Sequence, residues 1–494
     1  MPTNTHTAII IGSGFSGLAM AIKLKERGIH DFIVLEKAAA LGGTWRENTY
    51  PGAECDIPSA LYSYSFEPYP YWEYKWSMQP QILAYMKHVA DKYDLLRHIH
   101  FEKEMTSAQW MDAESHWAVE TRAGDTYRSR SLISAIGQLH HPREPDVKGK
   151  DLFEGMHWHS ARWRHDVALK DKVIGVIGNA ASAVQFIPEI AKTAKKVVVF
   201  QRTANWMLPK QDRAYKNWEK KLVVRFPFLL KFYRFKIWML TGFFFFLMKD
   251  KNHLLRKFYQ RKSINYVKKH IKDPDLVNAL TPTYPLGAKR VLFSDTYYQA
   301  LAQPNVQLVP GGIKEIRTWS VVGNDDSEHE VDVLIYATGF ITNPFLLRLD
   351  IRGEDQLSIQ DHWQQGPKTY LGMAVDRFPN LFIMYGPNTN IGHTSYLLVG
   401  EAQANYIAQC IQGLKDNGWS SMSVKPAVLN ENYNHNQEKL KRMIWAKVDK
   451  SWYRSKNGDI ANNYPDRIMK YQRKTRRVNF DDYDISTAAS NQSR

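Results

Sequence analysis

Two short stretches of small residues, each followed at the same distance by a charged residue, constrain this chain more than any other feature. Gly12–Gly17 (GSGFSG) and Gly178–Ala183 (GNAASA) each follow an apolar run typical of a buried strand and open a segment with helical periodicity. Glu36 and Arg202 lie 19 positions after the last small residue of their respective stretches. Strand, tight turn, helix and charged strand end form a dinucleotide-binding βαβ unit. The sequence therefore predicts an α/β fold with two Rossmann-like dinucleotide-binding domains.

The first stretch has every glycine that such a turn needs. Gly12 permits the tight turn, Gly14 lets the backbone approach a pyrophosphate, and Gly17 allows the helix to pack closely on the strand. Glu36 can accept a hydrogen bond from a free ribose hydroxyl, so we predict that this domain binds FAD. Asn388 follows a later buried strand that we assign to the same domain, and we predict that it contacts a cofactor from that strand end.

The second stretch keeps only its first glycine, and its charged residue has the opposite sign. Ala180 replaces the glycine that would touch a pyrophosphate, whereas Arg202 can neutralise a 2′-phosphate. A surface arginine without a ligand is the alternative. We predict that this domain binds NADPH through the turn, the helix start and the next strand end: Gly178, Asn179, Ser182, Arg202 and Thr203.

Two further apolar strands end at glycines and divide the chain. One ends at Gly137 and the other at Gly339, and proline follows each glycine within a few residues. Such segments are typical of crossings between domains. We predict a discontinuous FAD domain, an NADP domain within it and a polar tail, with these bounds: FAD domain 1–140 and 336–485, NADP domain 141–335, tail 486–494.

A helical insertion is predicted in the NADP domain at about 210–273. Between Lys220 and Lys269 it has 14 lysine or arginine residues and one acidic residue, interleaved with aromatic residues. One interpretation is a helical cap with a solvated basic face and a buried aromatic face. The other is a peripheral membrane contact or an entrance for an apolar substrate. The longest apolar run, Ile237–Met248, has 12 residues, whereas a spanning helix needs about 20.

Composition limits the remaining classes. The net charge of +16 suits polyanions, anionic membranes and phosphorylated cofactors alike. The two cysteines, Cys55 and Cys410, form no CxxC pair, which argues against a disulfide framework and a redox dithiol and indicates a reducing compartment. No export signal precedes the first strand, so we expect a cytoplasmic protein, with membrane association as the open alternative. No histidine has metal-ligand spacing, and we predict neither a metal nor a nucleic acid partner.

A long glycine-rich and aromatic loop follows the first charged strand end. It matches the pattern GGxWxxxxYPGxxxD at every fixed position from Gly42 to Asp56. In this pattern the chain resembles the type I Baeyer-Villiger monooxygenases, which belong to the flavin-containing monooxygenase superfamily. The resemblance implies that Gly43, Thr44, Trp45 and Asp56 contact the flavin cofactor.

A second signature of the same family, FxGxxxHxxxW, lies between the two dinucleotide motifs. Here it consists of Phe153, Gly155, His159 and Trp163, and Arg164 follows where the family usually has proline or aspartate. The resemblance implies that His159 couples the NADP domain to the active site during domain rotation. A lone histidine with a purely structural role is the alternative.

The segment Thr281–Arg290 resembles a family segment that carries a paired lysine and arginine. The resemblance implies that Lys289 contacts the 2′-phosphate beside Arg202. It also implies that Arg290 is the active-site arginine, which Asp56 holds in a bidentate pair. An ordinary salt bridge between Asp56 and Arg290 is the alternative.

By this resemblance the chain is an NADPH- and O2-dependent FAD monooxygenase, which inserts oxygen next to a ketone carbonyl through a flavin C4a-peroxide and gives esters or lactones. Arg290 would supply the positive charge for the anionic intermediates. Three alternatives stay open: a flavin monooxygenase that oxidises nitrogen or sulfur, a disulfide reductase that would need a second thiol beside Cys55, and a basic membrane- or nucleic-acid-binding protein. The sequence indicates neither the particular ketone nor the oligomeric state.

Overall fold

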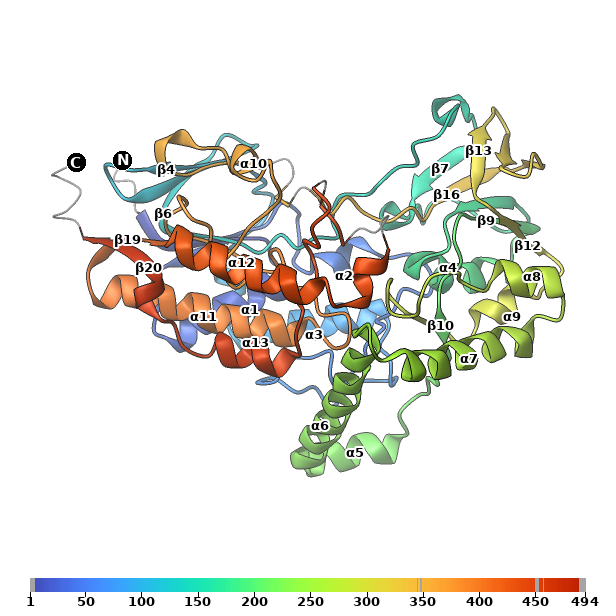
Figure 1. Ribbon diagram of the computed structural model, residues 1–494, viewed down its shortest axis with the longest axis horizontal. Coiled ribbons are helices and arrows are strands. Elements are labelled where there is room, and N and C mark those ends of the chain that lie inside the picture. Colours follow the sequence, from blue (N-terminus) through green and yellow to red (C-terminus); the bar gives the residue numbers. More distant parts are fainter. Residues whose placement is uncertain (1–4, 344, 347–348, 449–452, 456, 488–494) are drawn as a thin grey trace.

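The computed structural model describes residues 5–343, 345–346, 349–448, 453–455 and 457–487. Two α/β units lie side by side, and two helices project from the lower side of the molecule (Figure 1). The α/β class and the two sheets with parallel strands confirm the predicted fold class. β20 (Tyr483–Thr487) includes the first two residues of the predicted polar tail, and the rest of that tail lies outside the described residues.

The larger sheet takes strands from two distant parts of the chain. Its eight strands are β1 (Thr5–Ile11), β2 (Phe32–Leu35), β3 (Ile99–His100), β4 (Met105–Met111), β5 (His116–Thr121), β6 (Thr126–Ser134), β17 (Asp350–Arg352) and β18 (Leu381–Ile383). Their order is β17-β4-β5-β6-β1-β2-β3, and β18 pairs with the last residues of β6. β1 is parallel to both β2 and β6. Strands from 350–383 therefore join the sheet that residues 5–134 form.

β1 is buried on both of its faces, which explains its uninterrupted apolar sequence. Ala8 and Ile10 pack on one side with three helices, α1 (Phe15–Glu26), α3 (Gln79–Lys92) and α11 (Leu397–Asp416). Ile9 and Ile11 face the opposite cluster, which includes the indole rings of β4 and β5. The turn after β1 is consequently held in a rigid position at the edge of this core.

The second sheet has five parallel strands and a helix after its Gly-rich turn. The strands are β7 (Met156–His159), β8 (Val173–Ile177), β9 (Lys196–Gln201), β12 (Val306–Pro310) and β16 (Val333–Tyr336), in the order β12-β9-β8-β16-β7. α4 (Ala181–Ile190) and α9 (Tyr297–Leu301) pack on one face. On the other face lies the antiparallel sheet of β13 (Ile313–Ile316), β14 (Ser320–Gly323) and β15 (Glu328–Glu330).

Shorter elements complete the two units. These are α2 (Thr44–Glu47), α8 (Pro274–Ala279), α10 (Ile359–His362), α12 (Pro426–Leu440), α13 (Ile468–Lys474), β10 (Met207–Leu208), β11 (Leu292–Phe293) and β19 (Trp419–Val424). β10 pairs in parallel with β11, and β19 pairs antiparallel with β20.

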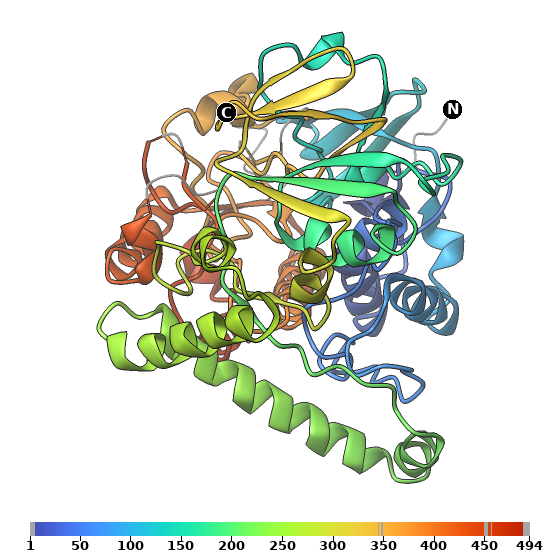
Figure 2. The same ribbon diagram turned by 90° about the vertical axis from the view of Figure 1, so that its right-hand side faces the viewer.

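The predicted insertion is helical, but its helices do not all pack on the unit that contains them in sequence. It forms α5 (Asn217–Arg225), α6 (Pro227–Phe244) and α7 (His253–His270). α7 packs on the second unit through Val267. α6 instead buries Leu230 and Ile237 against the first unit, beside α11 and α13. Figure 2 shows α6 as a long helix along the lower edge, with α5 at its far end.

Two crossings connect the units and run beside each other. The first contains Gly137 (φ +72°) and the second Gly339 (φ +80°). Phe340 forms an isolated antiparallel bridge with Pro142, and the Arg143 N–H donates to the Gly339 carbonyl oxygen at 2.9 Å. Because glycine adopts positive φ without strain, both crossings can turn sharply at these positions. The pair of crossings has the form of a two-stranded hinge.

Candidate active site

A cavity of about 590 Å³ lies between the two units. The first unit lines it with the turn after β1, the start of α2 and the segment 54–57. The second unit contributes Ala181 and Gln185 from α4. Eight residues predicted as site residues from the sequence line this cavity: Gly12, Gly14, Glu36, Gly43, Thr44, Trp45, Asp56 and Arg290.

Four glycines shape the turn after β1. Gly12 has φ +100°, and a Cβ atom at Gly17 would lie 1.9 Å from the Gly12 carbonyl oxygen. Gly43 faces Gly14, and a Cβ atom at Gly43 would lie 3.1 Å from the Gly14 Cα atom. Gly14 is also the N-cap of α1 and has no side chain to pair with the first N–H groups of that helix. A narrow, side-chain-free passage therefore leads to a helix N-terminus, an arrangement that suits a pyrophosphate.

The Glu36 carboxylate is buried beside this turn. Its Oε2 accepts hydrogen bonds from the Ser13 N–H (2.9 Å) and the Ser13 hydroxyl (2.6 Å). Its Oε1 accepts from the Ala38 N–H at 3.0 Å and from Arg46 Nη1 at 3.2 Å. A carboxylate has about four acceptor sites, so these bonds use all of them. A ribose hydroxyl can be accepted here only in place of one of these donors, and the Arg46 bond is the longest of the four.

The loop that carries the first family signature forms an aromatic part of the cavity wall. Thr44 and Trp45 begin α2, and Trp45 Nε1 donates to the Tyr62 hydroxyl at 3.0 Å. The side-chain amide of Gln79 donates to the Trp45 carbonyl oxygen. Both rings are thereby fixed at the cavity, where flat apolar surfaces suit an aromatic ligand ring.

Asp56 and Arg290 form a bidentate ion pair in the cavity wall. Arg290 Nε donates to Asp56 Oδ2 at 2.6 Å, and Nη2 donates to Oδ1 at 2.7 Å. The two residues are 234 positions apart in sequence, and the fold alone brings them together. The geometry is the fork-to-fork arrangement that only arginine can make with a carboxylate.

The electrostatics of this pair keep both partners charged. Partial burial in the cavity wall would raise the pKa of Asp56, but the charge and hydrogen bonds of Arg290 outweigh it, and the pKa lies below its usual value. The Asp56 carboxylate in turn holds the pKa of Arg290 well above its ordinary value, against the effect of burial. Burial also raises the pKa of the neighbouring Cys55 thiol, so this thiol stays protonated. The cavity thus contains a fixed cation and no reactive thiolate at Cys55.

Contacts between the first unit and α4 were not evident from the sequence. The Tyr50 hydroxyl donates to Gln185 Oε1 at 2.8 Å, and Gln185 Nε2 donates to the Glu54 carbonyl oxygen at 3.0 Å. The Glu54 carboxylate also pairs with the buried Lys210 ammonium. The one signal in the sequence was position, because Gln185 lies one helical turn after Ser182, on the same face of the predicted helix.

The turn after β8 has backbone angles similar to those of the turn after β1, although it contains alanines. Gly178 has φ +107°, and a Cβ atom there would lie 2.5 Å from the Ala337 carbonyl oxygen. Ala180, the N-cap of α4, has φ −87° and ψ −161°, close to the −77° and −172° of Gly14. An alanine adopts such angles without strain. The replacement of glycine by Ala180 therefore affects the approach of a ligand and not the turn itself.

Other predicted residues of the second turn hold it together internally. Asn179 Nδ2 donates to Gln201 Oε1 at 2.7 Å and to the Thr203 carbonyl oxygen at 3.1 Å. Ser182 lies half-buried near the Tyr50 hydroxyl. The Asn179 side chain and the Thr203 carbonyl thus connect the turn to the end of β9, where Arg202 is exposed.

Arg202 and Lys289 lie close enough for their charges to repel. Burial lowers the pKa of Lys289, and the charge of Arg202 lowers it further. The Lys289 ammonium lies 4.6 Å from the centre of the Tyr284 ring. Because these two neighbouring cations repel each other, a bound anion would relieve the repulsion, and the site therefore favours an anion.

The second family signature lies in and beside β7, at one edge of the second sheet. Phe153 is buried, and a Cβ atom at Gly155 would lie 2.6 Å from its ring. Trp163 packs its ring on Phe186, 5.3 Å away. Arg164, the departure from the family pattern, forms an exposed ion pair with Asp166 and leaves the Trp163 contact intact.

His159 connects this signature to the hinge. Its Nε2 lies 3.0 Å from the Gly339 carbonyl oxygen, and its Nδ1 accepts from the Ala161 N–H at 3.1 Å. The second bond requires an unprotonated Nδ1, so Nε2 carries the hydrogen and donates to Gly339. Burial, only partly opposed by the Gly339 carbonyl, lowers the pKa of His159. A neutral imidazole therefore fastens β7 to the second crossing.

Asn388 does not line the large cavity. It has φ +56°, and its Nδ2 donates to the carbonyl oxygens of Ile460 (2.7 Å) and Asn463 (3.0 Å). The cavity wall in this region is formed by Asn390 and Thr394. Tyr385, which the sequence did not single out, contacts the same wall through its hydroxyl, 3.1 Å from Asn390 Oδ1.

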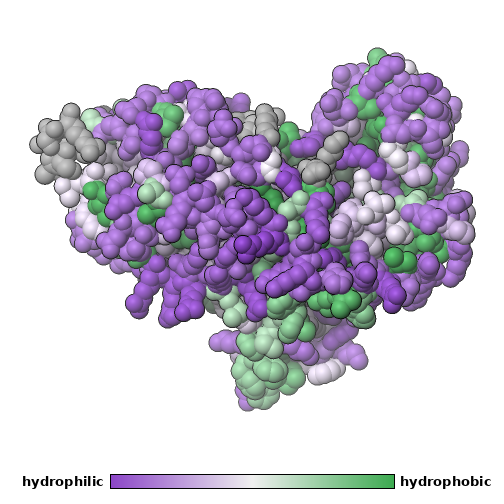
Figure 3. Space-filling view, viewed as in Figure 1, coloured by the Kyte–Doolittle hydropathy of each residue, from purple (hydrophilic) through white to green (hydrophobic). Residues whose placement is uncertain are grey.

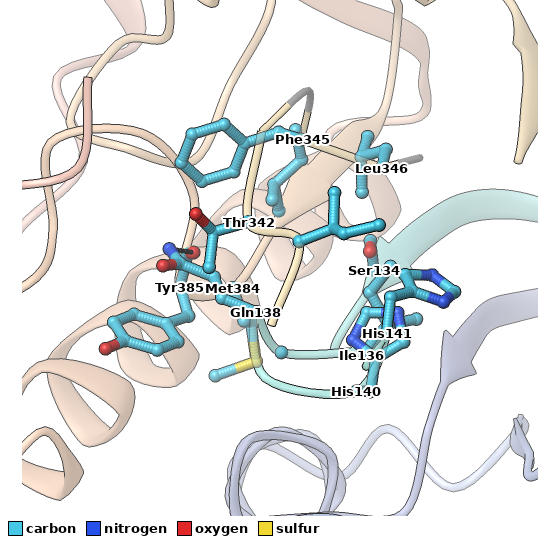
Figure 4. A pocket seen from close by; sticks show the side chains of 13 residues that line it. Ser134, Ile136, Gln138, His140, His141, Thr342, Phe345, Leu346, Met384 and Tyr385 are labelled. Carbon is cyan, nitrogen blue, oxygen red and sulfur yellow. Dashed lines mark hydrogen bonds between the residues drawn. The ribbon is translucent and has the colours of Figure 1, made fainter. Parts of the chain in front are cut away.

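A second, much smaller cavity of about 20 Å³ lies behind Tyr385, between the two crossings (Figure 4). Gln138 Nε2 donates to the Tyr385 carbonyl oxygen at 2.7 Å and ties the first crossing to this wall. Thr342 and Leu346 line the cavity from the side of the second crossing. Its volume suits about one water molecule, so it is part of the wall and not a substrate site.

Comparisons with known proteins agree with this geometry. The family model described as "Pyridine nucleotide-disulphide oxidoreductase" matches residues 9–222. The two cysteines of the chain, Cys55 and Cys410, are both free and buried. A Baeyer-Villiger monooxygenase of Streptomyces coelicolor is 38% identical over 96% of this chain and 92% of its own length.

Solved structures show the same relationship. The closed crystal structure of cyclohexanone monooxygenase has a TM-score of 0.88 and 28% identity, and it covers 98% of this chain and 100% of its own. OTEMO in complex with FAD and NADP also has a TM-score of 0.88 and 28% identity, with 97% and 99% covered. Together with the Gly-rich turns and the Asp56–Arg290 pair, these likenesses show that the chain belongs to the Baeyer-Villiger monooxygenases.

Proposed function

We propose that this protein is an NADPH- and O2-dependent FAD monooxygenase that inserts oxygen next to a ketone carbonyl and gives an ester or a lactone. The observation that carries the proposal is the bidentate pair of Arg290 and Asp56 in the cavity between two dinucleotide-binding turns. A permanent cation at this place suits a reaction whose transition state gains negative charge on oxygen.

The residues around the cavity fit FAD. The passage between Gly14 and Gly43 at the N-terminus of α1 suits the pyrophosphate, and Glu36 suits a ribose hydroxyl if Arg46 releases it. Trp45 offers a flat wall for the flavin ring. Bound FAD, reduced by NADPH, supplies the activation of O2.

Arg290 acts on the ketone by electrostatics. A guanidinium has five N–H donors, and the pair with Asp56 uses two, so three remain for oxygen atoms in the cavity. These donors stabilise the negative charge that develops on the ketone oxygen when its carbonyl carbon is attacked. Because its pKa is raised, Arg290 does not give up a proton in this role. Asp56 is a positioning residue that fixes the direction of the fork.

The second unit fits NADPH. Gly178 and the N-terminus of α4 suit the pyrophosphate, and Arg202 with Lys289 suits the 2′-phosphate. His159, through its bond to Gly339, couples rotation of this unit to the hinge.

We further propose that the units correspond to an FAD domain of residues 1–140 and 336–485 and an NADP domain of residues 141–335. The pairing of β18 with β6 and of β16 with both β7 and β8 supports this division. Peripheral contact with a membrane through the insertion belongs to the same proposal, since α5 and α6 project from the lower side of the molecule (Figure 1).

The test is product analysis with the purified flavoprotein, NADPH and a panel of linear, cyclic and aryl ketones. Arg290→Ala is expected to keep flavin reduction by NADPH and to lose ester formation. Arg162→Ala is the matched control, because Arg162 lines the same cavity and also pairs with a carboxylate, that of Glu47. Ester formation at the wild-type rate by Arg290→Ala, or oxidation of a thioether without any ketone product, contradicts the proposal.

A further inference from the structure

The insertion presents an unusually apolar surface to solvent. On α6 the side chains of Phe228, Phe232, Phe235 and Phe243 are 63%, 67%, 50% and 63% exposed. Figure 3 shows hydrophobic residues gathered over α5 and α6 at the lower end of a mostly hydrophilic face. A monomeric protein rarely exposes a continuous apolar patch of this kind unless the patch has a partner.

The same surface continues onto the neighbouring helices. Trp218 on α5 is 61% exposed, and Leu254 and Phe258 on α7 are 73% and 63% exposed. We call these three residues and the four phenylalanines of α6 the aromatic surface. Within the described ranges no helix is both long and apolar enough to cross a membrane.

The orientation of α6 is fixed, so the exposure is a property of the fold. Leu230 and Ile237 are buried against the first unit on one face of the helix. Arg234, between them, donates from Nη1 to the carbonyl oxygens of Ala60 (2.9 Å) and Ser63 (2.8 Å). A helix that is apolar on both faces is expected to be covered on both, and the first unit covers only one.

Exposed cations lie among the aromatic side chains. Lys221, Arg225, Lys231, Lys236 and Lys257 are all exposed. Asp250 is the only acidic residue between 220 and 269, and its carboxylate pairs with Lys447. Aromatic side chains at the depth of lipid head groups, with lysine and arginine around them, are typical of helices that lie in an anionic membrane interface.

The charge pattern also distinguishes between two apolar partners for the aromatic surface: a second copy of this chain and a lipid bilayer. A second copy of this chain, placed face to face on the aromatic surface, would bring the same cations together, and such like charges repel. An anionic bilayer neutralises them and accepts the aromatic rings. We propose that the aromatic surface of α5, α6 and α7 docks this protein on anionic phospholipid membranes, with α6 lying in the interface.

Docking would place the membrane beside the wall of the cavity. The Thr241 hydroxyl of α6 lies 3.1 Å from the Thr394 hydroxyl, and Thr394 lines the cavity. Phe245, just after α6, packs on His393 at 5.3 Å. If the proposed oxygenation holds, a ketone dissolved in lipid would be released close to this wall, but the docking itself does not depend on the reaction.

The test is flotation of the FAD-containing protein with phosphatidylcholine vesicles, with and without phosphatidylglycerol. We expect binding to the anionic vesicles that is at least about tenfold stronger than to the neutral ones and that falls as salt is added. Lack of binding to anionic vesicles at low salt overturns the proposal.

Variants separate docking from other effects. Phe228→Ser/Phe232→Ser/Phe235→Ser is expected to weaken binding at least about tenfold, whereas Leu152→Ser/Met156→Ser, two exposed apolar residues of the second unit, is expected to bind as wild type. Lys231→Gln/Lys236→Gln, which leaves the apolar side chains unchanged, is expected to weaken binding to anionic vesicles only.

Retained FAD and an unchanged melting temperature show that each variant is folded. Binding that none of these changes affects overturns the proposal, as does a wild-type dimer in sedimentation equilibrium that the serine variant dissociates.

Discussion

Arg290→Lys keeps a positive charge in the cavity but removes the planar fork. Arg290 Nε and Nη2 contact the two Asp56 oxygens at 2.6 and 2.7 Å, and an ammonium cannot make both contacts in this geometry. A lysine that pairs with Asp56 also points fewer donors into the cavity. The substitution therefore tests whether the direction of the charge matters and not merely its presence.

Arg290→Lys is expected to change the free energy of unfolding much less than the rate of ester formation. The Arg290 and Asp56 side chains are 41% and 25% exposed, so solvent screens their interaction and the loss of one bond costs about 1 kcal/mol of stability or less. Loss of one well-placed donor to a developing oxyanion costs about 2.7–4 kcal/mol of activation energy, or about 100- to 1,000-fold in rate. We expect a rate defect far larger than the stability defect.

Two assays separate these effects. Stopped-flow reduction of the flavin by NADPH should be unchanged within about twofold, because hydride transfer does not use the donors that face the ketone. Ester formation under saturating NADPH should fall about 100-fold or more. Ester formation by Arg290→Lys within a few-fold of the wild-type rate would refute this role of Arg290, as would a loss of flavin reduction as large as the loss of ester formation.

Three further changes probe the cofactor turns and the hinge. Arg202→Ala should raise the KM for NADPH at least about tenfold and leave the KM for NADH unchanged, since only NADPH has the 2′-phosphate; equal effects on both coenzymes would contradict the assignment. Gly17→Ala should lower the FAD content of the purified protein, because its Cβ atom would lie 1.9 Å from the Gly12 carbonyl oxygen. Full flavin occupancy in this variant would refute the prediction that the turn needs glycine here. His159 has a folded-state pKa below its unfolded value of 6.5, so its contribution to stability is complete above that pH and is lost as the pH falls through the folded pKa. His159→Gln can still donate to the Gly339 carbonyl and should show a smaller drop in melting temperature between about pH 7.5 and 5 than wild type; parallel curves would contradict a neutral His159.

Much of the cofactor geometry could be predicted from the sequence because it depends on local constraints. A tight turn with positive φ followed by close helix packing leaves glycine as the residue of choice at Gly12 and Gly17. The pairing of Asp56 with Arg290 was predictable only through the family patterns, because no local rule relates residues that far apart. The turn at Ala180 shows the opposite case, in which an apparent departure costs the backbone nothing because its φ is negative.

Other features depend on tertiary contacts that periodicity does not contain. The sequence of α6 predicts a helix with apolar residues on more than one side, but not that the face of Leu230 packs on the first unit while the face of Phe232 is exposed. Asn388 has the expected place at a strand end, yet its positive φ turns the side chain toward Ile460. The bond from Gln185 to Glu54 joins two units whose relative placement no single helix or loop specifies.

In the proposed function, this cavity transfers one atom of O2 into a ketone beside its carbonyl. The most direct measurement is mass spectrometry of the product formed under ¹⁸O₂ with NADPH and a ketone that the purified flavoprotein accepts. We expect one labelled oxygen in the ring or alkoxy position of the lactone or ester, with one NADPH consumed for each product molecule. An unlabelled product, or NADPH oxidation that yields only hydrogen peroxide with every ketone tested, would contradict it.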